Sequence, residues 1–150
     1  MTSQPKANPA AAPYLANEYE QKVAAFHAAF DTEIDQPVTA ALLRLRKTLL
    51  AEEVRELFEE MDSAIAALEA GEAVPLPVAA NMLKETADVQ YVLSGLSVTF
   101  GWPIAEVYAR VHDSNMSKLG ADGRPVRRAD GKVLKGPGYF APVLDDLVQK

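Results

Sequence analysis

The spacing of apolar residues restricts most of this chain to helices. Between residues 37 and 71, apolar side chains recur every three or four positions, which is the period of one helix face. This stripe consists of Leu42, Leu45, Leu49, Leu50, Val54, Leu57, Met61, Ile65 and Leu68. The chain also has 25 alanines, the residue with the highest helix propensity. We therefore predict an all-α fold.

Four main helices are expected; two have a proline in the first turn, and three are followed by a glycine. The first covers about 17–30 and should bury Val23, Phe26 and Phe30. The others cover about 37–70, 78–100 and 103–119, with Pro37 and Pro103 in first turns. Gly71, Gly101 and Gly120 are the stop signals.

The two ends of the chain differ from this helical body. Residues 1–16 are rich in Pro and Ala and read as a flexible tail, so the helical domain is expected over 17–119. Residues 120–150 form an irregular basic segment of that domain, with a small hairpin at Asp130-Gly131. This segment is a candidate lid.

Composition excludes several classes of function. The net charge is −6, which disfavours general nucleic-acid binding. The longest uncharged run, Val89 to Ala105, is interrupted by polar residues and is too short to cross a membrane. The absence of cysteine removes disulfides, thiolate metal sites and a Cys nucleophile, and fits a cytoplasmic protein.

Carboxylates lie on the predicted packing faces of two helices. Glu53 is four residues after Leu49 on the apolar stripe, and Glu56 follows one turn later. Glu85 interrupts the stripe of the third helix, with Asp88 one turn further on. Unpaired buried carboxylates are costly, and residues 52–88 contain ten acids but only two bases.

A divalent cation would neutralise these acids. Oxygen-only ligands select a hard ion, so we predict Mg²⁺, with Mn²⁺ as a substitute. A di-iron bundle needs Glu-x-x-His motifs, and neither His27 nor His112 follows a Glu by three positions.

The acidic residues resemble a family signature. EEVRE at 52–56 and ETAD at 85–88 resemble the EExxE plus ExxD pattern of the MazG-like all-α nucleoside triphosphate pyrophosphohydrolases. VHDSNMSKL and DGKVLKGPGYFAP resemble the C-terminal segment of members near the phosphoribosyl-ATP pyrophosphohydrolase branch. The resemblance covers about residues 20–144 and implies a four-helix bundle that associates as a homodimer.

The resemblance also implies an activity: cleavage of a nucleoside triphosphate between its α and β phosphates. Glu53, Glu56, Glu85 and Asp88 then correspond to the Mg²⁺ ligands, and Glu52 to a further ligand or to the base for the attacking water. Glu53 is a second candidate for the catalytic carboxylate. A carboxylate in a crowded anionic site can have its pKa raised toward neutrality, as a base requires.

Further residues are candidates for substrate contacts. Asn115 and Lys118 match the family's Asn-x-x-Lys position, as contacts to sugar and phosphate. Lys132 and Lys135 flank an Asp-Gly turn and could close over the β and γ phosphates, with Tyr139 as another lid candidate. His27, beside Phe26 and Phe30 on the first helix, could hydrogen-bond a base.

We expect dUTP as the preferred substrate, in a role of nucleotide-pool sanitation. One alternative is phosphoribosyl-ATP hydrolysis. Another is a non-catalytic helical dimerisation module, which would be indifferent to Mg²⁺.

Overall fold

The computed structural model describes residues 12–148 and is all-α, as predicted. Its four main helices are α1 (Glu18–Ala29), α2 (Ala40–Glu69), α3 (Leu76–Phe100) and α4 (Ile104–Met116). A short 3-10 helix, η2 (Pro13–Leu15), precedes them, and the short helix α5 (Asp145–Val148) follows them. The chain divides after Gly101 into two compact units. None of the described helices is long and apolar enough to cross a membrane.

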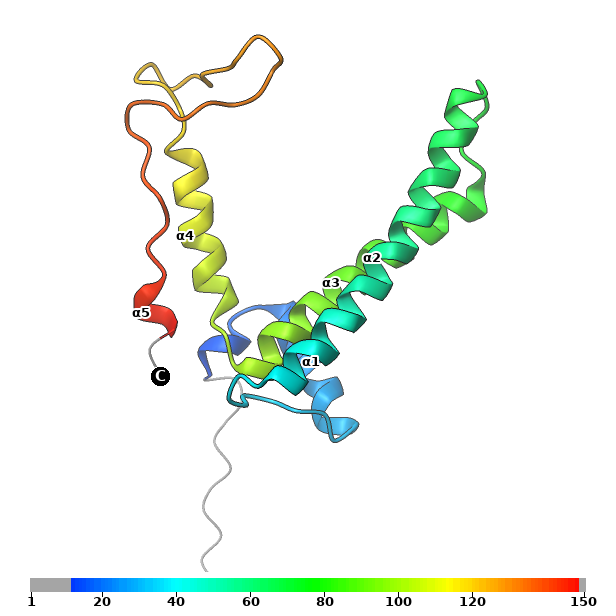
Figure 1. Ribbon diagram of the computed structural model, residues 1–150, viewed down its shortest axis with the longest axis vertical. Coiled ribbons are helices and arrows are strands. Elements are labelled where there is room, and N and C mark those ends of the chain that lie inside the picture. Colours follow the sequence, from blue (N-terminus) through cyan, green and yellow to red (C-terminus); the bar gives the residue numbers. More distant parts are fainter. Residues whose placement is uncertain (1–11, 149–150) are drawn as a thin grey trace, which may run out of the picture. The chain divides into compact units, whose positions relative to one another are not determined.

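In the first unit, α2 and α3 form a long antiparallel hairpin, and α1 packs on α3 (Figure 1). Gly71 and Gly101 both have left-handed backbones, with φ of 75° and 62°, so the predicted ends of α2 and α3 are confirmed. Asn17 caps α1 by accepting hydrogen bonds from the amides of Tyr19 and Glu20.

Two details of the first unit differ from expectation. Helix α2 does not begin at Pro37, because the Thr39 side chain accepts from the Leu42 amide and starts the helix at Ala40. Phe26 and Phe30 were expected to be buried but are 42% and 67% exposed. The face of α1 that packs inward carries Val23, as expected, together with Glu20 and His27.

The second unit contains α4 and the segment that returns along it (Figure 1). Ser114 Oγ on α4 donates to the Phe140 carbonyl at 2.8 Å, and the Phe140 amide donates to Ser117 Oγ at 3.1 Å. Arg110 on α4 binds both carboxylate oxygens of Asp146 on α5, at 2.6 and 2.9 Å. The C-terminal segment is therefore fastened to α4 at both Phe140 and α5.

The start of this segment differs from prediction. Helix α4 ends at Met116 and not at Leu119, so Lys118 lies in a turn after the helix. The amide of Gly136 donates to the Lys118 carbonyl at 2.9 Å and closes residues 119–135 into a loop. The predicted turn at Gly131 is confirmed, with φ of 85° and antiparallel pairing of Arg127 with Val133.

Candidate metal centre

Three carboxylates converge where α2 packs against α3. Glu53 and Glu56 are three residues apart on α2, and Glu85 lies on α3. One carboxylate oxygen from each lies within 4.8 Å of the other two. The pairing of the two helices has thus brought together three like charges, which repel one another unless a cation binds between them.

Burial makes Glu85 the most constrained of the three. Glu85 is only 7% exposed, and its buried Oε2 atom has no hydrogen-bond partner in the part of the chain that the structure describes. Its Oε1 accepts from the Lys84 ammonium at 3.0 Å. An unpartnered buried carboxylate oxygen beside two more carboxylates fits a hard divalent cation, for which oxygen is the preferred ligand.

The pKa of Glu53 is shifted by its burial and by the other acids that lie near it. Burial raises the pKa of Glu53, and the charges of Asp88, Glu56, Glu52 and Glu85 raise it further, in that order. Asp88 and Glu52 thus act on the cluster although they are outside the group of three converging oxygens. Glu53 holds a proton more readily than an isolated carboxyl group.

Each of the two bases nearby binds two acids. Lys84 donates to Glu85 and, at 2.7 Å, to Asp88, and these hydrogen bonds raise the pKa of Lys84. Arg55 donates to Glu56 at 3.3 Å and to Glu59 at 2.7 Å. The Lys84 ammonium therefore occupies carboxylate oxygens that a metal ion would use.

A comparison with protein families agrees with the arrangement of acids. The family described as phosphoribosyl-ATP pyrophosphohydrolase matches residues 23–115, well over half of the 150 residues. The chain belongs to the phosphoribosyl-ATP pyrophosphohydrolase family. It is thereby a member of the MazG-like all-α superfamily, as the sequence signature indicated. No curated protein gives a significant match.

The family match includes His27 and all the acids of the cluster. His27 is buried, at 3% exposure, and its Nδ1 lies 2.8 Å from the Glu33 carbonyl. Because a carbonyl only accepts, Nδ1 carries the proton and Nε2 has a free lone pair when the ring is neutral. Its role as a substrate contact stays a prediction.

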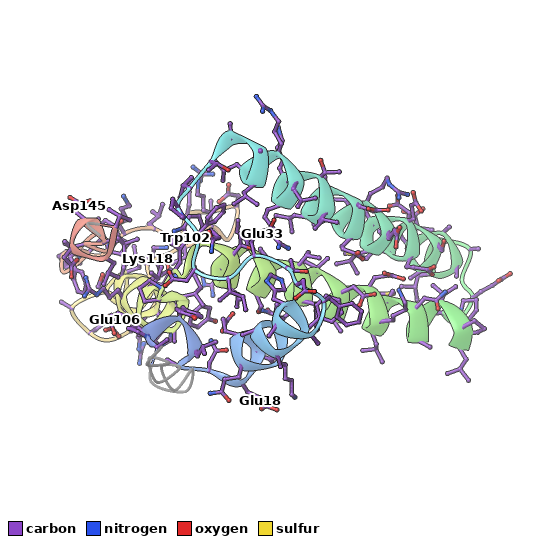
Figure 2. The ribbon with its side chains drawn as sticks, turned by 90° about the horizontal axis from the view of Figure 1, so that it is seen from below. Glu18, Glu33, Trp102, Glu106, Lys118 and Asp145 are labelled. Atoms are coloured by element: carbon purple, nitrogen blue, oxygen red, sulfur yellow. The ribbon has the colours of Figure 1, made fainter. Side chains whose placement is uncertain are left out.

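The other predicted contacts of this family member lie in the second unit (Figure 2 labels Lys118). Lys118 Nζ donates to Asn115 Oδ1 at 2.7 Å, so the two residues remain neighbours although the helix ends between them. Lys135 lies 4.2 Å from the centre of the Tyr139 ring, in cation–π contact. Lys132 is exposed near the turn at Gly131. Their roles as substrate contacts also stay predictions.

Sequence reasoning missed one residue, Arg46 on α2, which is only 7% exposed. The signal was available, because Arg46 is seven residues before Glu53 and three before Leu49, on the same predicted apolar stripe. A base on a packing face is as informative as an acid there.

Proposed function

We propose that this protein is a metal-dependent pyrophosphohydrolase that cleaves its nucleotide substrate between the α and β phosphates. The observation that carries the proposal is the convergence of Glu53, Glu56 and Glu85, with one oxygen of Glu85 buried and unpartnered. Family membership supports the type of reaction.

The three converging carboxylates would hold Mg²⁺ or Mn²⁺, and Asp88 would join them when Lys84 moves away. When bound, the ion polarises a phosphoryl oxygen and orients the attacking water. Glu53, whose pKa is raised by burial and by four neighbouring acids, is suited to accept a proton from that water. Glu52 is exposed beside it and is the alternative base or a further ligand.

Phosphoribosyl-ATP is the first substrate to test, because the matching family bears its name. The second is dUTP, the substrate expected first from the resemblance to a family that includes dimeric dUTPases. Both present the same triphosphate to the metal. They differ at the base end of the molecule, which the acidic cluster would not contact.

The leaving pyrophosphate needs cations besides the metal, because a triphosphate carries about four negative charges near neutrality. We propose Lys118, Lys132 and Lys135 for this role, with Asn115 on the sugar or phosphate and Tyr139 in the same segment. Residues 118–135 contain six bases and two acids, which supports an anion-binding role for this segment.

A substrate panel tests the proposal. Phosphoribosyl-ATP, dUTP, dCTP and ATP are incubated with Mg²⁺, with Mn²⁺ or with EDTA, and the products are separated by chromatography. Pyrophosphate with the matching monophosphate product, formed only with metal, is the expected result. Glu85→Gln should abolish it, whereas Glu59→Gln should not. Inorganic phosphate with a nucleoside diphosphate would show cleavage between the β and γ phosphates and would refute the proposed reaction. No turnover of any substrate would leave a non-catalytic helical module as the better description.

We also propose that the protein is a homodimer. The hairpin exposes large apolar side chains, among them Phe58, Ile65, Leu68, Leu76 and Leu83, at 47% to 82%. Apolar side chains gathered on one element mark protein interaction surfaces. Sedimentation equilibrium should give twice the chain mass of 16.2 kDa. A mass of one chain at micromolar concentration would refute the dimer without affecting the metal site.

A further inference from the structure

Arg46 carries buried hydrogen-bond donors that no residue among 12–148 satisfies. Its Nε and Nη2 atoms are buried and have no partner. Burial lowers the pKa of the guanidinium, and the charge of Glu33 acts in the opposite direction. A buried charged donor without a partner costs free energy. A binding partner other than the folded chain would explain why Arg46 is kept at this position.

The surroundings of Arg46 are open to it because α3 has a glycine there. A Cβ on Gly95 would lie 3.3 Å from Arg46 Nη1 and 3.6 Å from His27 Nε2. Arg46 on α2 and His27 on α1 therefore meet over the same bare stretch of the α3 backbone. The His27 ring adds an acceptor at Nε2, since burial and, to a smaller extent, the Arg46 charge lower its pKa and favour the neutral ring.

Arg46 lies on the same face of α2 as Glu53 of the carboxylate cluster. Arg46 precedes Glu53 by seven residues, two helical turns, which places it on the same face of α2 about 10 Å away. A substrate whose α phosphate lies at the carboxylates extends its nucleoside over a comparable length. A nucleoside that extends from the carboxylates along α2 toward Arg46 would bring its end remote from the triphosphate to the guanidinium.

We propose that Arg46 is a specificity-determining residue that binds an oxygen acceptor at this remote end of the substrate. The inference rests on the proposed function and adds a means of selecting the substrate. In phosphoribosyl-ATP the oxygen belongs to the phosphate on the second ribose, and in dUTP to a uracil carbonyl. The guanidinium fork fits either, and most strongly a phosphate. The adenine of ATP has no oxygen to offer.

Access runs past the segment that joins α1 to α2. Figure 2 shows Glu33 on this segment, beside α3. Asp31 and Asp35, on either side of Glu33, have left-handed backbones with φ of 51° and 50°, which is strained for residues other than glycine. The Asp35 amide donates to the Val98 carbonyl on α3 at 3.0 Å. Arg46 is only 7% exposed, so the proposal requires this segment, whose Glu33 charge acts on the guanidinium, to shift when the substrate binds.

The test compares kcat/KM for phosphoribosyl-ATP, dUTP and ATP in the wild type and in Arg46→Met. The variant should lose roughly tenfold to hundredfold with the oxygen-bearing substrate and little with ATP, as expected for a lost charge-assisted contact. Whichever of the two substrates is affected identifies the source of the oxygen. Arg44→Met, at an exposed arginine on the same helix, is the matched control and should leave all three values unchanged.

Melting of the ligand-free protein separates recognition from a structural role. If Arg46 is held for the ligand, Arg46→Met removes an unsatisfied buried charge and the melting temperature stays equal or rises. Equal loss with all substrates, together with a lower melting temperature, would overturn the inference. If Arg46→Met does not fold, Arg46→Lys takes its place, because it keeps the charge but loses the planar guanidinium. Unchanged ratios of kcat/KM among the three substrates in Arg46→Lys would then overturn the inference. A wild type that cleaves no substrate refutes the proposed function itself, before any variant is compared.

Discussion

Replacing Glu85 by Gln should reduce the stabilisation of the protein by Mg²⁺. At a Mg²⁺ concentration one hundred times its dissociation constant, mass action stabilises the wild type by about 2.7 kcal/mol. At about 4 °C per kcal/mol for a chain of this size, the melting temperature rises by roughly 10 °C. The assay is calorimetry of each protein in EDTA and at that fixed Mg²⁺ concentration.

The substitution preserves the shape of the site while removing the charge. The amide oxygen of Gln can still accept from Lys84, as Glu85 Oε1 does at 3.0 Å, and its amide nitrogen occupies the position of the unpartnered Oε2. Loss of one charged contact weakens Mg²⁺ binding by roughly tenfold to hundredfold. The shift at the same Mg²⁺ concentration then falls to about 2 to 6 °C. In EDTA the variant should melt at the same temperature or higher, because repulsion from Glu53 and Glu56 is relieved.

Glu59→Gln is the matched control for this experiment. Glu59 is on α2 close to the cluster, but its 63% exposed side chain pairs with Arg55. It should keep the full Mg²⁺ shift. The reasoning is refuted if Glu85→Gln also keeps that shift, if Glu59→Gln loses as much, or if neither Mg²⁺ nor Mn²⁺ affects the wild type.

Three further changes have directions that the structure fixes. Lys84→Met removes the ammonium that occupies Glu85 and Asp88, so calorimetric titration should show tighter Mg²⁺ binding; unchanged affinity would mean that Lys84 does not compete. Burial lowers the pKa of His27 below its ordinary value of 6.5, so the unfolded chain binds the proton more readily and the free energy of unfolding falls as the pH drops below 6.5. His27→Gln should reduce this pH dependence, measured by urea unfolding at about pH 5.5 and about pH 8. A chain ending at Leu119 should keep its Mg²⁺-induced stabilisation and lose on the order of a hundredfold in kcat/KM, and full turnover would show that the basic segment is dispensable.

Local features of the sequence were enough to predict most of the fold. Helical periodicity and glycine stops depend on neighbours in the chain, so α1, α3 and the ends of the hairpin could be placed to within about two residues. The start of α2 was wrong because two competing local signals, Pro37 and the Thr39 cap, are both typical of a helix start. The end of α4 was wrong because the chain beyond Met116 folds back in the second unit, and the sequence gives no periodic signal for that return.

Part of the candidate site could likewise be predicted from the sequence, and part of it depends on the tertiary structure. The acidic positions could be found from the sequence alone, because carboxylates at packing positions break a pattern that is visible along one helix. Which of them converge was decided by the register of α2 against α3, which joins Glu53, Glu56 and Glu85 and leaves Asp88 bound to Lys84. The state of Arg46 also needed the fold, because whether a buried donor finds a partner depends on three helices meeting at Gly95. Periodicity is a property of one segment, whereas convergence, burial and missing partners are properties of segments brought together, and only the tertiary structure supplies them.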